Sequence, residues 1–219
     1  MHFPLNRTIS CRITPWLARW KFTPNQITGL SLVTGLLAAW DFLQGTAQAL
    51  VWGAVWFEIS YLLDNCDGEL ARLTRRTSGF GSWLDTVSDC LIHGAFFLGL
   101  GFGLHRVRGD LLWMILGWAA AVGVLLTYVV FLLGQLQQRG PSAWLHPDLP
   151  FEERLTFAGR VRKVFREDFA LIVLVSTCAH QVSWLLWAGA MGAHLHWFST
   201  AFALLRTSCA GERMRGVPS

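Results

Sequence analysis

Apolar residues follow one another in runs long enough to cross a membrane, separated by short polar links. The first run is Ile27 to Leu43, the second is about 47 to 73, and a third begins near Gly81. Three more cover about 111 to 133, 168 to 188 and 191 to 205, each near the ~20 residues that a bilayer requires. The pattern predicts an all-α, polytopic membrane protein with six transmembrane helices.

The segment before the first run has a different pattern. Between residues 5 and 20, apolar residues such as Leu5, Ile13 and Trp16 recur at helical intervals, with arginines between them. This predicts a basic amphipathic helix on the membrane surface, bent or broken near Pro15, and the alternative is a disordered tail. Thr23 is expected to cap the next helix, with Pro24 in its first turn.

Composition supports the same class of protein. Of 219 residues, 53% are hydrophobic and only 15% are charged, which is too apolar for an ordinary soluble domain. The five cysteines form no CxxC pair, so neither a disulfide framework nor a zinc site is predicted. We expect no cleavable signal peptide. The expected division is a juxtamembrane segment (1–22), a six-span domain (23–210) and a tail (211–219).

Basic residues are distributed unequally about the predicted spans. Of the 18 lysines and arginines, only Arg106 and Arg108 fall between spans three and four, and none falls between spans one and two or five and six. The other 16 lie near the termini or after spans two and four, so we expect both termini on the cytosolic side of a bacterial or archaeal cell membrane. Membrane orientation and anionic lipid account for the net charge of +4, without nucleic acid.

Four aspartates stand inside this apolar sequence, where an unpaired ionised carboxylate would cost several kcal/mol, roughly. Asp64 and Asp67 are three residues apart, and Asp85 and Asp89 are four apart, so each pair projects from one face of a helix. Two such helices can direct four carboxylates into one space. Oxygen ligands select Mg²⁺, Mn²⁺ or Ca²⁺ over zinc, and four carboxylates are enough for two divalent ions.

Small and basic residues follow the first aspartate pair. Gly68 and Ala71 lie on the same side as Asp64 and Asp67, where their small side chains leave room for the phosphates of a ligand. Arg72 supplies a guanidinium fork suited to phosphate oxygens. The pattern therefore favours a site that binds cations and a phosphorylated ligand together.

Eight residues at fixed spacing resemble the signature of the CDP-alcohol phosphotransferases, the CDP-alcohol phosphatidyltransferase family. They are Asp64, Asp67, Gly68, Ala71, Arg72, Gly81, Asp85 and Asp89. The stretch from Thr23 to Thr28, the length of the chain and its hydropathy are also similar to that family. The resemblance implies transfer of a substituted phosphate, most often phosphatidyl, from a CDP-linked donor such as CDP-diacylglycerol to an alcohol, with release of CMP.

The resemblance also assigns roles to residues. It implies that Asp64, Asp67, Asp85 and Asp89 bind two Mg²⁺ or Mn²⁺ ions, and that Asp89 acts in addition as the general base. It implies a homodimer, a CDP-linked lipid donor and a small polar alcohol acceptor, in phospholipid biosynthesis. The residues expected to bind the substrate are Asn25, Thr28, Gly68, Ala71, Arg72, Ser78 and Gly81.

Alternatives remain at the level of function and of single residues. A divalent-cation or proton-coupled transporter would also carry intramembrane acids, but it does not account for Gly68, Ala71, Arg72 and Gly81 at their spacings. The motif does not identify the acceptor, and Glu58 has no explanation beyond a structural role. Basic residues before the fifth span reflect either membrane orientation or, for Arg166 above all, binding of an anionic group on the acceptor.

Overall fold

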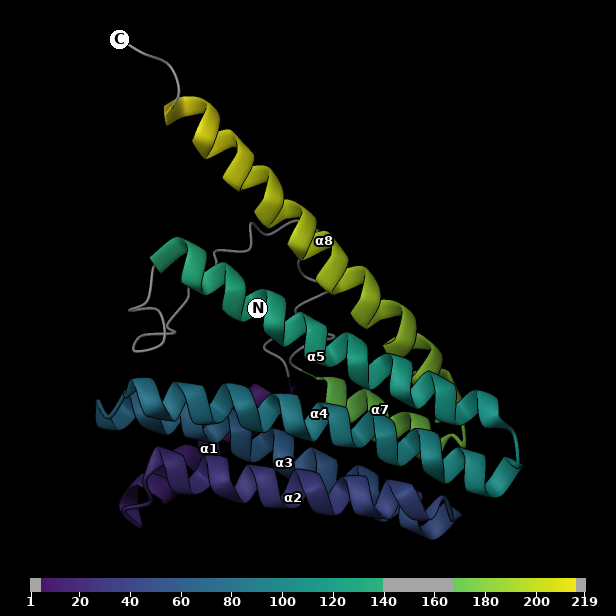
Figure 1. The fold of residues 1–219 in the computed structure, drawn as a ribbon. Coiled ribbons are helices and arrows are strands. Elements are labelled where there is room, and N and C mark those ends of the chain that lie inside the picture. The colour runs from purple at the N-terminus through teal and green to yellow at the C-terminus, as the bar shows by residue number, and fades with distance from the viewer. Residues whose placement is uncertain (1–4, 140–167, 216–219) are drawn as a thin grey trace.

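The computed structural model describes residues 5–139 and 168–215, and these ranges are helical apart from short connections (Figure 1). No strand occurs within them. The predicted all-helical class is therefore confirmed, whereas Arg166 and the basic residues near it lie outside the described ranges. The helices are α1 (Leu5–Arg19), α2 (Pro24–Gln44), α3 (Ala47–Thr74), α4 (Gly79–Arg108), α5 (Leu111–Arg139), α7 (Phe169–Cys178) and α8 (Ser183–Arg215).

Side-chain caps define the starts of the helices around the aspartates. The Thr23 hydroxyl accepts a hydrogen bond from the backbone N–H of Gln26, while the Gln26 side chain accepts one from the N–H of Thr23. This capping box confirms the predicted start of α2 at Pro24. Ser78 caps α4 in the same way, since its hydroxyl accepts from the N–H of Gly81 at 3.0 Å.

Within the described ranges, three helices are long and apolar enough to cross a membrane, namely α2, α4 and the Leu111–Gly134 part of α5. The α3 helix has 28 residues and packs against both α1 and α2, but its aspartates and glutamates make it less apolar. Figure 1 shows α2, α3 and α4 side by side, with α5 and α8 diverging from them. The class of membrane protein agrees with the sequence, and the number of six spans stays a prediction.

Glycines bring α2 and α4 into backbone contact at the end far from the aspartates. A Cβ on Gly103 would overlap the carbonyl oxygen of Phe42, and one on Gly99 would overlap that of Ala39. Gly45 ends α2 with a φ of +70°, a backbone conformation that suits glycine, and it also touches Gly103. Helices in lipid associate by this kind of close packing, so the contact fixes how α2 and α4 cross.

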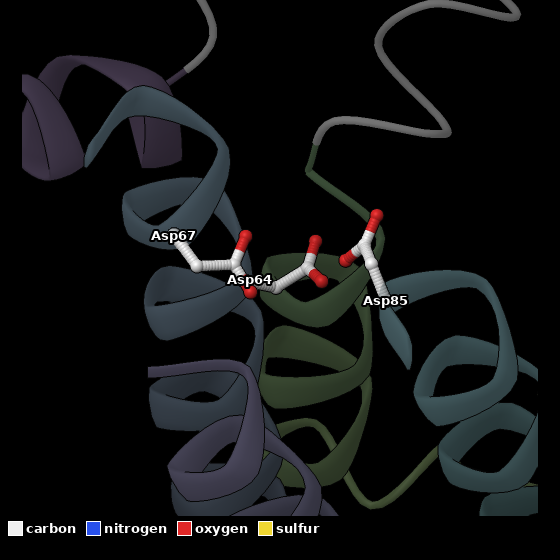
Figure 2. A group of neighbouring side chains, drawn as sticks. All are labelled: Asp64, Asp67 and Asp85. Carbon is white, nitrogen blue, oxygen red and sulfur yellow. The ribbon is translucent and has the colours of Figure 1, made fainter. Parts of the chain in front are cut away.

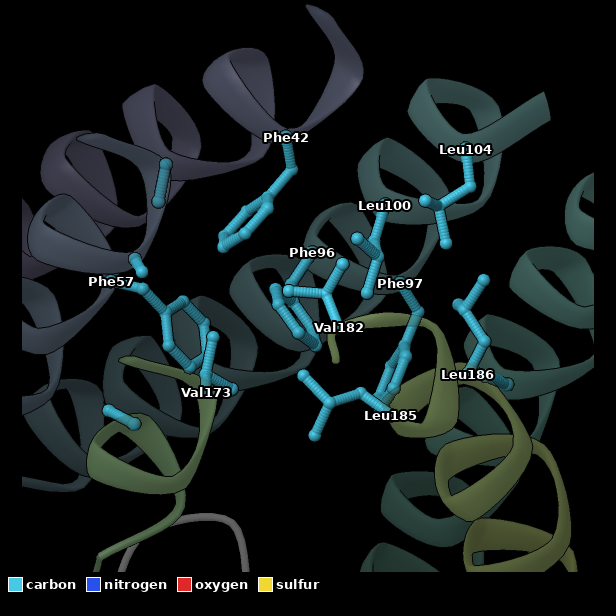
Figure 3. Close-up of a cluster of buried hydrophobic side chains, with 14 of the residues drawn as sticks. Phe42, Phe57, Phe96, Phe97, Leu100, Leu104, Val173, Val182, Leu185 and Leu186 are labelled. Carbon is cyan, nitrogen blue, oxygen red and sulfur yellow. The ribbon is translucent and has the colours of Figure 1, made fainter. Parts of the chain in front are cut away.

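An aromatic core joins the helices next to the aspartates (Figure 3). The rings of Phe57 and Phe96 stack with centroids 4.7 Å apart, and Phe42 meets Phe96 edge to face at 5.1 Å. Helices α7 and α8 add buried residues such as Val173 and Leu185 to the same cluster. This core therefore holds α2, α3, α4, α7 and α8 together in a fixed arrangement.

The predicted boundary between the last two apolar helices is wrong. The break lies at residues 179–182 instead of 189–190, so α7 has only 10 residues and α8 has 33. At the break His180 has a φ of +57°, Gln181 donates its N–H to the Ser176 carbonyl, and His180 donates to that of Thr177. These two bonds form a Schellman motif, which ends a helix. Glycine is the usual residue at this position, so a histidine there did not predict the end of a helix.

The N-terminal segment is a helix that continues through Pro15, so of the predicted bend or break at this residue the break does not occur. Its buried residues are polar, namely Asn6, Ser10 and Thr14. Several large apolar side chains point outward, with Trp16 65% exposed and Trp20, just after the helix, 72% exposed, whereas Leu17 near its end packs inward. This arrangement is the reverse of an amphipathic helix on a soluble protein, whose apolar face is buried.

Candidate active site

Three of the four aspartates form one cluster (Figure 2). Asp64 and Asp67 come from adjacent turns of α3, and Asp85 faces them from the second turn of α4. One carboxylate oxygen from each lies within 4.8 Å of the others. Asp67 is buried, and its Oδ2 accepts a hydrogen bond of 2.5 Å from the Thr28 hydroxyl of α2. The predicted convergence of the two aspartate pairs is therefore seen for these three residues.

The cluster fits a divalent cation of the kind predicted. Ligands on opposite sides of Mg²⁺ or Mn²⁺ lie roughly 4 Å apart, so oxygens within 4.8 Å of one another need only small shifts to share an ion. All three donors are carboxylate oxygens, which hard cations prefer. Carboxylates this close repel one another when ionised, so a bound cation or proton must stabilise them.

Asp89 lies one turn further along α4 and is not part of the three-residue cluster. Its carboxylate interacts with Asp64 on one side and with the hydroxyl of Tyr128, from α5, on the other. The backbone carbonyl of Asp89 also contacts Nδ1 of His93 at 2.8 Å. Asp89 is thus connected to the other aspartates through Asp64, and it also contacts His93 of its own helix and Tyr128 of α5.

A cavity of about 440 Å³ opens beside the cluster, between α2, α3 and α4. It contains all seven residues that the sequence analysis expected to bind the substrate, although no ligand is present to show a contact. Three polar lining residues, Arg76, Thr77 and Ser82, were not among those expected. The full lining is Pro24, Asn25, Thr28, Asp67, Gly68, Ala71, Arg72, Arg76, Thr77, Ser78, Gly81, Ser82 and Asp85.

The two signature glycines of the first cavity differ in how closely they are packed. A Cβ on Gly81 would lie 2.9 Å from Oδ1 of Asn25 and 3.0 Å from the Ser78 hydroxyl, closer than side chains normally pack. Gly68 has room for a Cβ, whose nearest neighbour would be the Arg72 guanidinium at 3.5 Å. Gly81 therefore clears space around polar groups of the cavity, which favours a ligand that approaches the backbone closely.

A second cavity, of about 340 Å³, lies on the other side of Asp85, between α4, α5 and α8. Both cavities reach Ser82 and Asp85, whereas Asp89 lines only the second. Its walls are rich in hydroxyl groups and also contain an imidazole and a phenyl ring. The lining residues are Ser82, Asp85, Thr86, Asp89, Thr127, Tyr128, Phe131, His196 and Thr200.

Sequence reasoning missed the part of the site that comes from α5 and α8. His196 lines the second cavity although no motif surrounds it in the sequence. His194, two residues earlier, instead packs against neighbouring groups: it contacts the Ala119 carbonyl at 3.0 Å and accepts a hydrogen bond from Trp197. Tyr128 stands in an apolar run without a motif, so only its position beside Asp89 reveals it.

Comparison with known proteins gives an independent view of the chain. Over 100 residues it is 42% identical to the bifunctional IPC transferase and DIPP synthase of Aquifex aeolicus, covering 46% of this chain and 22% of that protein. Over 105 residues it is 33% identical to archaetidylinositol phosphate synthase of Pyrococcus horikoshii, covering 48% and 54% respectively. The chain thus spans about a fifth of the first relative and about half of the second.

A solved structure has a similar fold. It is the crystal structure of phosphatidylinositol phosphate synthase from Mycobacterium tuberculosis with CDP-DAG bound, with a TM-score of 0.66 and 22% sequence identity. The similarity covers 90% of this chain and 94% of that one. The model of the CDP-alcohol phosphatidyltransferase family matches residues 21–205. This match covers most of the chain, including both aspartate pairs, and the protein therefore belongs to the CDP-alcohol phosphatidyltransferase family.

Proposed function

We propose that this protein transfers a substituted phosphate group, most simply phosphatidyl, from a CDP-linked lipid to the hydroxyl of a small polar alcohol, with release of CMP. Family membership and the printed activity of the second relative, a synthase of an inositol phosphate lipid, support this proposal. The family match leaves the alternative of a transporter without support.

The observation that carries the proposal is the meeting of two cavities at Asp85, with Asp89 in only one of them. A transfer between two substrates needs a donor on one side of the reacting phosphorus and a hydroxyl on the other, in line with the leaving group. The first cavity, with its arginines and signature glycines, suits the CDP-linked donor. The second cavity brings a hydroxyl to Asp89.

The chain's own residues can then carry out the transfer. The acceptor oxygen forms a bond to the β-phosphorus, its proton passes to the Asp89 carboxylate, and the bond to the oxygen of CMP breaks. Arg72 and Arg76 are placed to bind the phosphates of the nucleotide. Asp64, Asp67 and Asp85, with Asp89, would hold two divalent ions, which when bound neutralise the diphosphate and the departing CMP.

The direct test is CMP release from CDP-diacylglycerol by the purified protein, with a panel of acceptors and identification of products by mass spectrometry. Activity should require Mg²⁺ or Mn²⁺ and disappear with EDTA. Full activity in EDTA would rule out the metal-dependent mechanism. Inositol phosphate heads the acceptor panel, because the second relative and the structural neighbour are named as synthases of inositol phosphate lipids. Glycerol phosphate and serine complete it.

The same proposal includes the place of Arg166, which lies outside the described residues. In the sequence it comes three residues before α7 begins at Phe169, and we expect the link that carries it on the cytosolic side, where a guanidinium would suit binding of an acceptor phosphate. Arg166→Ala should then raise KM for a phosphorylated acceptor about tenfold, a loss of roughly 1.4 kcal/mol, and leave KM for the donor little changed. Equal weakening of both substrates would return Arg166 to a role in membrane orientation.

The proposed enzyme is a multi-pass membrane protein that assembles as a dimer. We infer six spans, with α1 on the membrane surface, both termini in the cytosol and the first cavity open to that side. The positions of the basic residues in the sequence support this orientation. The proposed assembly is a homodimer, and a single-protomer mass in native mass spectrometry would contradict it.

A further inference from the structure

Glu69 lies inside the signature, at a position that the family motif leaves unspecified. It is two residues after Asp67, so the two side chains leave α3 on nearly opposite faces. Asp67 and Gly68 line the first cavity, while Glu69 reaches α1. One face of this turn of α3 therefore lines the candidate active site, and the other face contacts the N-terminal helix α1.

Three side chains of α1 donate hydrogen bonds to the Glu69 carboxylate. Oε1 accepts from the Ser10 hydroxyl at 2.9 Å and from the Cys11 thiol at 3.2 Å, and Oε2 accepts from the Thr14 hydroxyl at 2.8 Å. Ser10 is 0% exposed and Thr14 is 3% exposed. We call Glu69 and these three donors the Glu69 clasp. A carboxylate deprived of such donors would have to move toward water, and α3 would move with it.

A small apolar cluster links the Glu69 clasp to the first cavity. Ile27 of α2 and Cys66 and Leu70 of α3 are almost fully buried, and Leu17 and Phe22, at the end of α1 and just after it, pack against them. Thr28, the neighbour of Ile27, donates to the Asp67 carboxylate. A shift of α1 would therefore reach both α2 and α3, the two helices that carry Asn25, Thr28 and Asp67.

The opposite face of α1 is suited to a lipid bilayer. Leu5, Trp16 and Trp20 are 54%, 65% and 72% exposed, and the exposed side chains between them include Arg7 and Arg12. Tryptophan and arginine side by side are typical of a helix in the headgroup region of an anionic membrane. Because the other face of α1 is held by Glu69, a bilayer bound to α1 would lie on the side of the α1–α3 pair away from the aspartate cluster.

We propose that Glu69 is a positioning residue: through the Glu69 clasp, α1 holds the turn of α3 that carries Asp67, Gly68 and Arg72 in the geometry that binds the nucleotide. The identity of the nucleotide rests on the proposed function. The affinity for the donor then depends on the Glu69 clasp, a hydrogen-bonded contact outside the first cavity.

The test uses the full-length protein in nanodiscs of phosphatidylcholine and phosphatidylglycerol, with CDP as the probe and Mn²⁺ present. Isothermal titration should show that Glu69→Gln and Thr14→Val each weaken CDP binding by about fivefold or more. Thr14→Ser restores the hydroxyl and should recover wild-type affinity. Thr34→Val is the matched control, because the Thr34 hydroxyl bonds only to carbonyls of its own helix among the contacts found.

Kinetics separate positioning from a general loss of structure. In Glu69→Gln, KM for CDP-diacylglycerol should rise while KM for the acceptor and kcat at saturating donor stay near the wild-type values. If the wild type bound CDP and Glu69→Gln bound it equally well, Glu69 would have no positioning role. If kcat fell, both KM values rose and Tm dropped together, the contact would be structural only. If the wild type itself bound no CDP, the proposed donor site would be wrong.

Discussion

At Gly81 the effect of a single methyl group can be predicted. A Cβ would crowd Asn25 and Ser78, two polar residues of the first cavity. Gly81→Ala should therefore raise KM for the CDP-linked donor about tenfold, or roughly 1.4 kcal/mol, with less effect on KM for the acceptor. Gly94→Ala is the control on the same helix, because a Cβ at Gly94 would have no neighbour within 4 Å. Steady-state kinetics that gave the same KM for both variants would contradict this prediction.

Asp89 should matter for the rate more than for binding of the donor, because it lines only the second cavity. Asp89→Asn keeps the shape of the side chain, but an amide cannot accept the hydroxyl proton. We expect kcat to fall by about 10²-fold or more and KM for the donor to change much less. Measurement of both constants tests this role, and a near-wild-type kcat would exclude Asp89 as the general base.

The reactivity of the Cys11 thiol shows whether it is hydrogen-bonded to Glu69, and it can be measured without an assay of enzymatic activity. The hydrogen bond to the Glu69 carboxylate is the largest cause that raises the pKa of Cys11. A raised pKa leaves less thiolate at pH 8, so the exposed thiol should react slowly with iodoacetamide. Glu69→Gln replaces the charged acceptor with a neutral, weaker one and should speed alkylation of Cys11 about twofold or more, as followed by peptide mass spectrometry. The exposed Cys178 is the internal control, and an unchanged Cys11 rate would show that the bond is absent in solution.

The sequence predicts the residues of the first cavity better than those of the second. Six residues of the first cavity belong to one motif with fixed spacing, namely Asp67, Gly68, Ala71, Arg72, Gly81 and Asp85, and helical periodicity brings them to one side of α3 and the start of α4. Tyr128 and His196 of the second cavity are far from the motif along the chain and belong to no local pattern. Only the crossing of α4, α5 and α8 brings them to Asp89.

Among the helices, the apolar runs predicted most boundaries, and hydrogen bonding decided the rest. The starts of α2 and α3 follow from Thr23 and Thr46, which cap them as threonines commonly do. Gly189 and Gly192 lie within α8, although glycines often end helices. A Cβ on Gly189 would overlap the ring of Phe97, so this glycine serves packing against α4, which the sequence alone does not reveal.

The contact between α2 and α4 predicts a large effect of a small substitution. A methyl group at Gly103 would meet backbone atoms of Phe42 and Gly45, which cannot rotate away as a side chain can. Gly103→Ala should destabilise the fold by about 1–3 kcal/mol, the usual range for overpacking. Thermal unfolding in detergent, followed by tryptophan fluorescence, would show a lower Tm than for Gly94→Ala. Equal Tm values would mean that the two helices separate easily at this point.

For the whole molecule, the distribution of positive charge predicts the orientation in the membrane. In a cysteine-free background, Arg19→Cys should be labelled by an impermeant maleimide only after the cells are opened, because α1 is expected on the cytosolic side. Arg106→Cys, in the exposed last turn of α4, should be labelled in intact cells. The reverse pattern would overturn the orientation, and labelling of both in intact cells would exclude an odd number of spans between them.

The two cavities divide the chain at Gly109, and this has a consequence for how such proteins diversify. Every residue of the first cavity precedes Gly109, whereas the second adds only residues of α5 and α8 to a few from α4. A chimera that joins residues 1–108 to the last helices of a homologue would thus keep the first cavity of this protein. It would take the α5 and α8 walls of the second cavity from the homologue. Lineages could acquire new headgroup chemistry by drift after Gly109 while the nucleotide half stays under constant selection.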